Sequence, residues 1–323
     1  MPLIQTRGAA SAQGFGLFAA GGSRCCLADG NKGIFALGCV GGCSSTTRNK
    51  YTYATCTSTA AGVGVSTQIS GAGSAAGNNT RGIFSMSLGG PIDATRNKHT
   101  YSSCTSTACG VGSASSGAYA GSASGNSTRG IFTLGITNCI GRSTIRNKYT
   151  YSSCTSTASG VAAASANTSC GSAVGNSTRG IIAQGCNLSL TIARDKYTYA
   201  TCTSTSCGVG TASVLSRSGN AAAGNSTRGI FSLGDGTTRN KYTYACCTST
   251  ASGVGAASAC TFWASATGNS TRGIFALGYS GGASTTRNKY TYSSCTSTAS
   301  GVGAASTASF KGSAASWAAC VNT

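Results

Sequence analysis

Few side chains in this sequence can take part in acid–base chemistry. His99 is the only histidine, and the four acidic residues are Asp29, Asp93, Asp195 and Asp235, which leaves no Glu. A glycosidase carboxylate pair, a Ser-His-Asp triad or a site with several histidine ligands would need residues that are missing or scattered. The sequence therefore predicts a protein that is not an enzyme, with no catalytic residues, no metal and no cofactor.

The 18 cysteines are the other reactive group. Neither Cys25-Cys26 nor Cys246-Cys247 has the C-x-x-C spacing of a zinc knuckle. Several cysteines recur at equivalent places, and we expect Cys56, Cys104, Cys154 and Cys202 to be small buried residues within a sheet. Cysteines in or near variable loops are the candidates for disulfides: Cys39, Cys43, Cys109, Cys139, Cys170, Cys186, Cys207 and Cys260.

An internal repeat organises the chain. Gly-Ile-Phe or Gly-Ile-Ile begins at Gly33, Gly82, Gly130, Gly180, Gly229 and Gly273, so six copies follow one another at intervals of 44 to 50 residues. With 48 Gly, 7% aromatic residues and two Trp, a single large core is excluded, and many small similar units must provide the stability.

Each repeat carries strand signals and no convincing helical ones. Residues 50–59 are rich in aromatic and β-branched side chains, residues 33–38 form a short apolar run between glycines, and 63–65 and 74–76 are two further short candidates. Four short strands per repeat are typical of a β-propeller blade. We therefore expect an all-β fold, a β-propeller of six four-stranded blades, or seven if the N-terminal segment forms its own blade.

The whole chain, residues 1–323, is predicted to be one propeller domain. Residues 33–311 contain the six repeats, whereas 1–32 and 312–323 resemble pieces of inner strands. A ring closes when one blade takes strands from both termini, because this removes the free sheet edge. We expect these two terminal segments to close the ring.

One stretch carries a family resemblance. Residues 74–90, Ser-Ala-Ala-Gly-Asn-Asn-Thr-Arg-Gly-Ile-Phe-Ser-Met-Ser-Leu-Gly-Gly, followed by Lys-His-Thr-Tyr, resemble a kelch repeat. In that family a small-residue inner strand precedes an apolar strand that ends in Gly-Gly. The resemblance implies a β-propeller and covers nearly all of the chain.

Positive charge recurs with the repeat. The chain has 23 Lys and Arg against 4 acidic residues, a net charge of +19. Rotation would arrange the repeated cations in rings that could bind a polyanion such as an acidic glycan, a nucleic acid or an acidic protein. The candidates are Arg81, Arg129, Arg179, Arg228 and Arg272, and Arg48, Arg96, Arg146, Arg239 and Arg287. The alternative is structural: these side chains tie neighbouring blades together through backbone carbonyls.

These observations predict a non-enzymatic binding or structural protein. Loops that vary on an unchanging scaffold suggest a virion or phage-tail protein that contacts a host surface glycan or another virion protein. The alternatives are a secreted propeller enzyme, a glycan hydrolase or lyase, and a propeller that binds nucleic acid or another polyanion. The start of the chain lacks a secretory signal and no apolar run could span a membrane, so we expect release by lysis and a virion or extracellular location.

Overall fold

The protein is all-β in the part that its computed structural model describes. That part comprises residues 32–40, 43–86, 92–138, 141–167, 169–187, 189–215, 221–234, 236–260, 262–279 and 281–316. Within these ranges the chain forms strands β1 to β32 and no helix. Since no helix is present there, these ranges also contain none that could cross a membrane.

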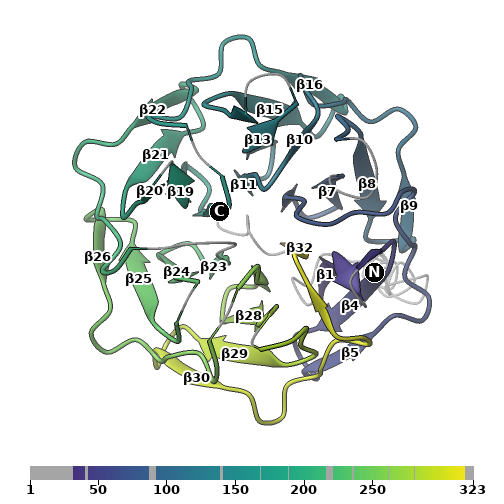
Figure 1. Cartoon of the computed structure of the whole chain (residues 1–323), viewed down its shortest axis with the longest axis vertical. Helices are drawn as coiled ribbons and strands as arrows, with labels where there is room; N and C mark the ends of the chain where they lie inside the picture. Colours follow the sequence, from purple (N-terminus) through teal and green to yellow (C-terminus); the bar gives the residue numbers. More distant parts are fainter. Residues whose placement is uncertain are drawn as a thin grey trace, which may run out of the picture.

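Six four-stranded antiparallel sheets are arranged in a propeller-like ring around a central axis (Figure 1). In each sheet the strands run from the centre to the rim in the same order: a short inner strand, a second strand with the Gly-Ile motif, a third strand with the Arg-Asn-Lys motif, and an outer Thr-Ser-Thr strand. Each of the six repeats therefore corresponds to one sheet.

The strand bounds reflect this repetition. The inner strands are β6 (Ala75–Gly77), β11 (Ser122–Gly125), β17 (Ser172–Gly175), β23 (Ala222–Gly224), β27 (Ser265–Gly268) and β32 (Ser313–Ser316). The second strands are β1 (Lys32–Ala36), β7 (Arg81–Ser85), β12 (Arg129–Thr133), β18 (Arg179–Ala183), β24 (Arg228–Ser232) and β28 (Arg272–Ala276). The third strands are β4 (Arg48–Thr52), β8 (Arg96–Thr100), β15 (Arg146–Thr150), β21 (Arg194–Thr198), β25 (Arg239–Thr243) and β29 (Arg287–Thr291). The outer strands are β5 (Thr57–Thr59), β9 (Thr105–Thr107), β16 (Thr155–Thr157), β22 (Thr203–Thr205), β26 (Thr248–Thr250) and β30 (Thr296–Thr298).

Small side chains on the inner strands allow the six sheets to meet at the axis. Each inner strand contacts the inner strands on both sides of it, so that β32, β6, β11, β17, β23 and β27 form a closed circle. These strands consist mainly of Ser, Ala and Gly, and they enclose a narrow central space of about 70 Å³. Larger residues at these positions would force the sheets apart.

The hydrophobic core lies between neighbouring sheets. At one such interface Ile83 of β7 packs against Phe132 of β12 and Tyr149 of β15, together with Tyr151 and Val111. Equivalent clusters recur around the ring. The apolar Gly-Ile strand is therefore buried on both faces.

Two strand predictions were wrong in detail. Residues 50–59 form two strands, β4 and β5, because the chain turns at Tyr53 to Cys56. Residues 63–65 form no strand; they are part of a connection whose Gly64 N–H donates to the carbonyl of Cys104 in the next sheet, at 2.6 Å. The fourth strand of each sheet is the Thr-Ser-Thr segment at the rim.

The last described strand pairs with the first. β32 is antiparallel to β1, with Gly33 opposite Ser316 and Ala36 opposite Ser313. Every other inner strand precedes its second strand directly in the chain, so this one sheet joins two distant segments. Residues 1–31, which include nearly all of the predicted N-terminal closing segment, lie outside the described residues, as does the Gly89-Gly90 pair of the kelch resemblance.

Short additional strands lie in the variable loops. One three-stranded sheet contains β10 (Ala118–Tyr119), β13 (Ile136–Thr137) and β14 (Gly141–Arg142), and another contains β2 (Cys39–Val40), β3 (Cys43–Ser44) and β31 (Ser309–Phe310). A hairpin joins β19 (Cys186–Asn187) to β20 (Ser189–Leu190). These loops therefore have their own backbone pairing.

Candidate functional site

The arginines that begin the third strands are buried and do not present charge at the surface. Arg96 is 1% exposed; its Nη2 donates to Oδ1 of Asn147 in the next sheet at 3.2 Å, its Nη1 donates to Oγ of Ser156, and its guanidinium lies 4.4 Å from the centre of the Phe132 ring. Burial lowers the pKa of Arg96 to about 10, so the group stays charged at neutral pH. The same burial, at 1%, applies to Arg48, Arg146, Arg194, Arg239 and Arg287.

This burial corrects one half of the polyanion prediction. A charged group that is sealed between two sheets cannot pair with an anion in solution. Arg48, Arg96, Arg146, Arg239 and Arg287 instead bridge neighbouring sheets, through amide oxygens in four cases and a carboxylate in the fifth. Desolvation of the guanidinium is offset by these hydrogen bonds and by the aromatic ring below it.

One of these contacts is an ion pair. Asp195 replaces the Asn of the repeat, and its Oδ2 accepts from Nη2 of Arg146 at 2.6 Å with both side chains fully buried. Asp195 also accepts from the hydroxyl of Ser165 at 2.6 Å and from Nε2 of Gln184 at 3.1 Å. Both oxygens of the Asp195 carboxylate therefore accept hydrogen bonds from residues of the fold.

The arginines that begin the second strands are half-buried and also connect sheets. Nη1 of Arg129 donates to the carbonyl of Tyr199 in the next sheet at 2.8 Å and lies 3.7 Å from Sγ of Cys202. The same pair of contacts is made by Arg81, Arg179, Arg228 and Arg272. Both sets of arginines therefore join neighbouring sheets: the second-strand set through backbone carbonyls, as the structural alternative states, and the third-strand set through side-chain oxygens.

An asparagine turn positions each of these arginines. Oδ1 of Asn126 accepts from the backbone N–H groups of Thr128 and Arg129 at 3.0 Å each, and its Nδ2 donates to the carbonyl of Ser177 in the next sheet at 3.0 Å. An Asn that caps a turn in this way is common before a strand. The repeated Asn-x-Ser/Thr sequence is explained by this turn.

The repeat cysteines lie in turns and are not buried within a strand. Cys56, Cys104, Cys154 and Cys202 have φ of 54° to 57°, a left-handed conformation that is uncommon for residues other than Gly. All four are half-buried, and the carbonyl of Cys104 accepts from the connection of the preceding sheet. The expectation that they are buried strand residues was wrong.

No disulfide joins the cysteines that the structure describes, which include the candidates Cys39, Cys43, Cys109, Cys170, Cys207 and Cys260. Cys39 and Cys43 share a hairpin, but Cys39 is opposite Ser44 and Cys43 is opposite Val40, so their side chains lie on opposite faces. Cys109 and Cys207 are exposed at the rims of different sheets. Cys139 and the side chain of Cys186 lie outside the described residues.

The mouth of the central channel is the feature that the sequence did not indicate. Five residues at equivalent places, directly before the inner strands, have a left-handed backbone although none is Gly: Ala72, Ala120, Cys170, Trp263 and Lys311, with φ of 46° to 57°. Such a conformation costs roughly 1–2 kcal/mol for each residue. Non-glycine residues held in this region often mark ligand sites.

Backbone hydrogen bonds hold this ring in place. The N–H of Cys170 donates to the carbonyl of Ala120 at 2.7 Å, that of Ala120 to Ala72 at 2.9 Å, and that of Ala72 to Lys311 at 2.7 Å. The N–H of Lys311 continues the series to Trp263 at 2.9 Å. The backbone of the mouth is therefore fixed, while its side chains differ from one repeat to the next.

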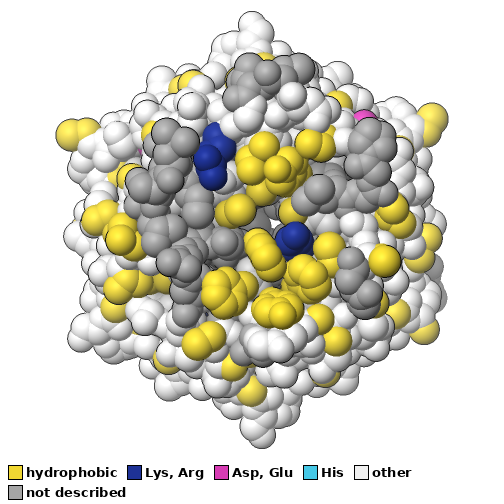
Figure 2. Space-filling model, viewed as in Figure 1, with side chains coloured by type: hydrophobic (Ala, Val, Ile, Leu, Met, Phe, Trp, Pro, Cys, Tyr) yellow, Lys and Arg dark blue, Asp and Glu magenta, His cyan; other side chains and the backbone are white. Residues whose placement is uncertain are grey.

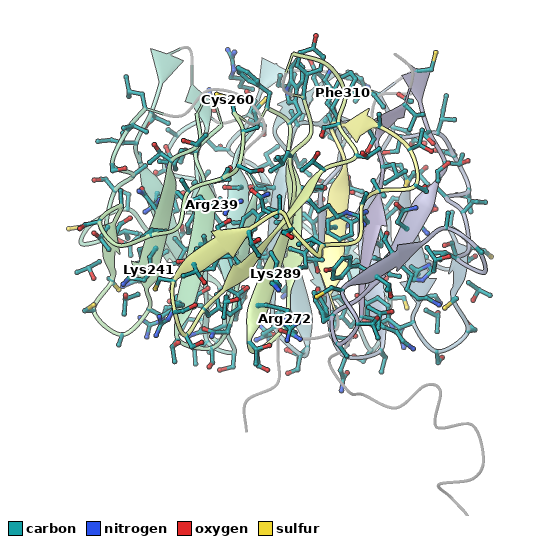
Figure 3. All side chains as sticks on the ribbon, turned by 90° about the horizontal axis from the view of Figure 1, so that it is seen from below. Arg239, Lys241, Cys260, Arg272, Lys289 and Phe310 are labelled. Atoms are coloured by element: carbon teal, nitrogen blue, oxygen red, sulfur yellow. The ribbon has the colours of Figure 1, made fainter. Side chains whose placement is uncertain are left out.

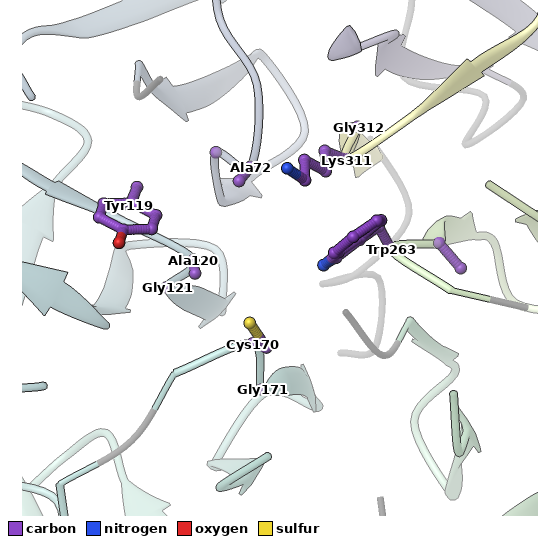
Figure 4. A pocket seen from close by; sticks show the side chains of 11 residues that line it. Ala72, Tyr119, Ala120, Gly121, Cys170, Gly171, Trp263, Lys311 and Gly312 are labelled. Atoms are coloured by element: carbon purple, nitrogen blue, oxygen red, sulfur yellow. The ribbon is translucent and has the colours of Figure 1, made fainter. Parts of the chain in front are cut away.

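These residues line a pocket of about 200 Å³, together with Tyr119 and the glycines that follow them (Figure 4). Nζ of Lys311 lies 4.4 Å from the centre of the Trp263 ring. Phe310 and Tyr279 complete an aromatic cluster, with ring centres 5.7 Å and 6.5 Å from that of Trp263. Figure 2 shows hydrophobic side chains gathered around a hollow at the centre of this face.

Small residues, two aromatic rings, Cys170 and Lys311 line this pocket. Neither His99 nor Asp195 lines it, and both are fully buried. In the described ranges no three His, Cys, Asp or Glu side chains are grouped so that they could hold a metal ion. Two aromatic rings and one lysine can bind a ligand by ring contacts and by charge.

Comparison with known proteins adds no identity. Neither a model of a known protein family nor a curated protein sequence matches this chain. The kelch and phage resemblances therefore depend on the repeat pattern alone.

Proposed function

We propose that this protein is a non-catalytic binding module, a six-bladed β-propeller whose ligand site is the mouth of its central channel. The closed circle of inner strands and the pairing of β32 with β1 support the propeller. The observation that carries the function is the ring of five left-handed residues, because it fixes the backbone at places where the side chain varies.

A surface glycan is the ligand that suits this pocket best. Sugar rings present flat patches of C–H groups that pack against aromatic side chains, and Trp263, Tyr119 and Phe310 offer such surfaces at or beside the mouth. Lys311 adds a cation that can bind a carboxylate or a hydroxyl of the same sugar. The virion or extracellular location, and a virion protein as a partner, stay predictions that no described feature addresses.

Binding to a glycan array, followed by titration of the best ligand, tests this proposal. Trp263→Ala should weaken binding about tenfold or more, because a central aromatic anchor typically contributes over 1.4 kcal/mol. Ala is compatible with this backbone, since Ala72 and Ala120 have the same left-handed conformation.

Val65→Ala is the matched control, because Val65 is 58% exposed and does not line the pocket. The control should bind like the unchanged protein. Equal affinity of the Trp263→Ala variant and the unchanged protein for every bound glycan would exclude the mouth as the site.

A further inference from the structure

A second surface, at the opposite end of the ring from the mouth, contains repeated basic grooves. Figure 3 shows Arg272 and Lys289 toward one end of the molecule, whereas Cys260 and Phe310 lie toward the other. One groove, of about 260 Å³, lies between two neighbouring sheets and is lined by Arg81, Arg129 and Lys148. Another, of about 350 Å³, is lined by Arg228, Arg272 and Lys289.

Each groove combines three cations with hydroxyl groups and no acidic side chain. Exposed Ser127, Thr128 and Ser152 line the first groove, and exposed Ser270, Thr271 and Ser293 line the second. The acidic residues that the structure describes do not oppose this charge: Asp195 is buried in its ion pair, and Asp93 lines neither groove. The grooves therefore present positive charge that no described carboxylate neutralises.

The arginines in the grooves are held in place before any ligand arrives. Nη1 of Arg81 donates to the carbonyl of Tyr151 at 3.1 Å, and Nη1 of Arg228 donates to that of Tyr292 at 2.9 Å. A guanidinium carries five N–H donors in a planar fork, so one engaged nitrogen fixes the direction of the others. Fixing these side chains in advance reduces the entropy that binding would cost.

The same residue types recur around the ring. Each second strand other than β1 begins with Arg, and the third position of every third strand is a half-exposed Lys: Lys50, Lys98, Lys148, Lys196, Lys241 and Lys289. A polymer that occupies one groove is tethered close to the next, and its effective concentration there is high. Weak anion contacts can therefore add up to tight binding of a chain.

The shape and the side chains favour a sulfated glycan over a nucleic acid. Single-stranded nucleic acids are bound mainly by stacking on exposed aromatic rings, but Tyr151 and Tyr292 in these grooves are each 2% exposed. Duplex DNA is stiff over about 150 base pairs, so bending it around the six sheets would cost much more free energy than bending a flexible chain. We propose that the ring of grooves binds a flexible sulfated glycan chain through its sulfate groups.

Heparin affinity measured at several salt concentrations tests this proposal. Changing all six lysines to Gln removes cations from the grooves without touching the Arg bonds between sheets. Each lost sulfate contact should reduce the salt slope of log K by roughly 0.7–0.9, the value known for nucleic-acid phosphates. We expect the six-site variant to lose about two or more units of slope and at least tenfold in affinity at low salt.

Arg142→Gln is the control, since it removes a cation that lines neither the mouth pocket nor the two grooves described. It should leave heparin binding unchanged. Loss of heparin binding in Trp263→Ala together with an unchanged salt slope in the lysine variants would place heparin at the mouth and overturn this proposal. A variant with only Lys148, Lys196 and Lys241 changed keeps the test valid if the six-site variant folds poorly. An unchanged slope in the folded lysine variants, or equal binding of desulfated heparin or of duplex DNA, would overturn the proposal.

Discussion

His99 is a single residue that departs from its repeat. The five equivalent positions hold Tyr51, Tyr149, Tyr197, Tyr242 and Tyr290. His99 lies fully buried with Nδ1 3.0 Å from Oγ of Ser106. Burial, and then the charge of Arg48, lower the pKa of His99 to about 3. The imidazole of His99 is therefore neutral in the folded protein at pH values well above 3.

This pKa predicts a specific pH dependence of stability. Below pH 6.5 the unfolded chain binds a proton at His99 that the folded chain does not bind until about pH 3. Stability is therefore fully present above pH 6.5 and falls by about 1.4 kcal/mol per pH unit as the pH drops between these two values.

His99→Tyr restores the residue of the other sheets and should remove this part of the acid sensitivity. Urea unfolding at several pH values between 7 and 4 measures the difference between the two proteins. Asp93, whose pKa is lowered chiefly by a hydrogen bond from Thr95, adds an acid-induced loss that both proteins share, so it cancels in the comparison. Parallel pH curves for the two proteins would show that the imidazole is not the cause.

At the scale of strands, a basic side chain contributes to stability where it forms a hydrogen bond to the neighbouring sheet. Arg129→Gln removes the bond from Nη1 to the carbonyl of Tyr199 while β12 and β18 keep their own ladders. We expect a loss of roughly 1 kcal/mol, less than the usual 1.5–3 kcal/mol for a charged hydrogen bond because Arg129 is half-exposed.

Lys148→Gln on the adjacent third strand is the comparison for Arg129→Gln. It removes the same charge, and Lys148 makes no side-chain hydrogen bond to another sheet in the part of the chain that the structure describes, so it should leave the thermal midpoint nearly unchanged. Differential scanning calorimetry of both variants measures this. An equal midpoint for the two variants would mean that the contact with Tyr199 contributes nothing to stability.

The sequence predicted a strand correctly where the residue types of the segment favour one backbone conformation. The Gly-Ile strand and the small-residue inner strand follow from their composition, and the structure places both close to the expected bounds. The turn at Tyr53 to Cys56 was hidden, because its left-handed position holds Cys where a turn normally shows Gly or Asn. A run of Tyr, Thr and Cys therefore looks like one continuous strand.

The same reason hid the mouth of the channel. A series of hydrogen bonds between different repeats holds Trp263 and Lys311 in their left-handed backbone, and no local sequence signal indicates such a bond. The sequence shows that the arginines recur in every repeat, but this recurrence does not distinguish arginines on the surface from buried arginines. Only the packing of Arg96 over Phe132 reveals that its charge faces inward.

For the whole molecule, stability depends on how the ring closes. Each inner strand contacts two neighbours, and β32 both completes this circle and covers the edge of β1. An open sheet edge exposes unpaired N–H and C=O groups and invites pairing with another chain. We therefore expect the loss of β32 to lower the stability of the whole ring, although β32 belongs to a single sheet.

A chain that ends at Lys311 should lose this closure. It lacks β32, so the edge of β1 from Gly33 to Ala36 has no partner, and β27 and β6 each lose a neighbour. The ladder bonds alone contribute about 0.5–1.5 kcal/mol each, so we expect a loss of several kcal/mol and a tendency to form dimers or larger assemblies.

A chain that ends at Ser316 is the control, because it retains all of β32. Guanidinium unfolding followed by tyrosine fluorescence compares the two, and light scattering reports the assemblies. Adding a peptide of residues 312–323 to the shorter chain should restore much of the lost stability, since β32 would then pair with β1 in trans as it does within the chain. Equal unfolding midpoints for the two truncated chains would mean that the contacts between the sheets hold the ring closed without this strand.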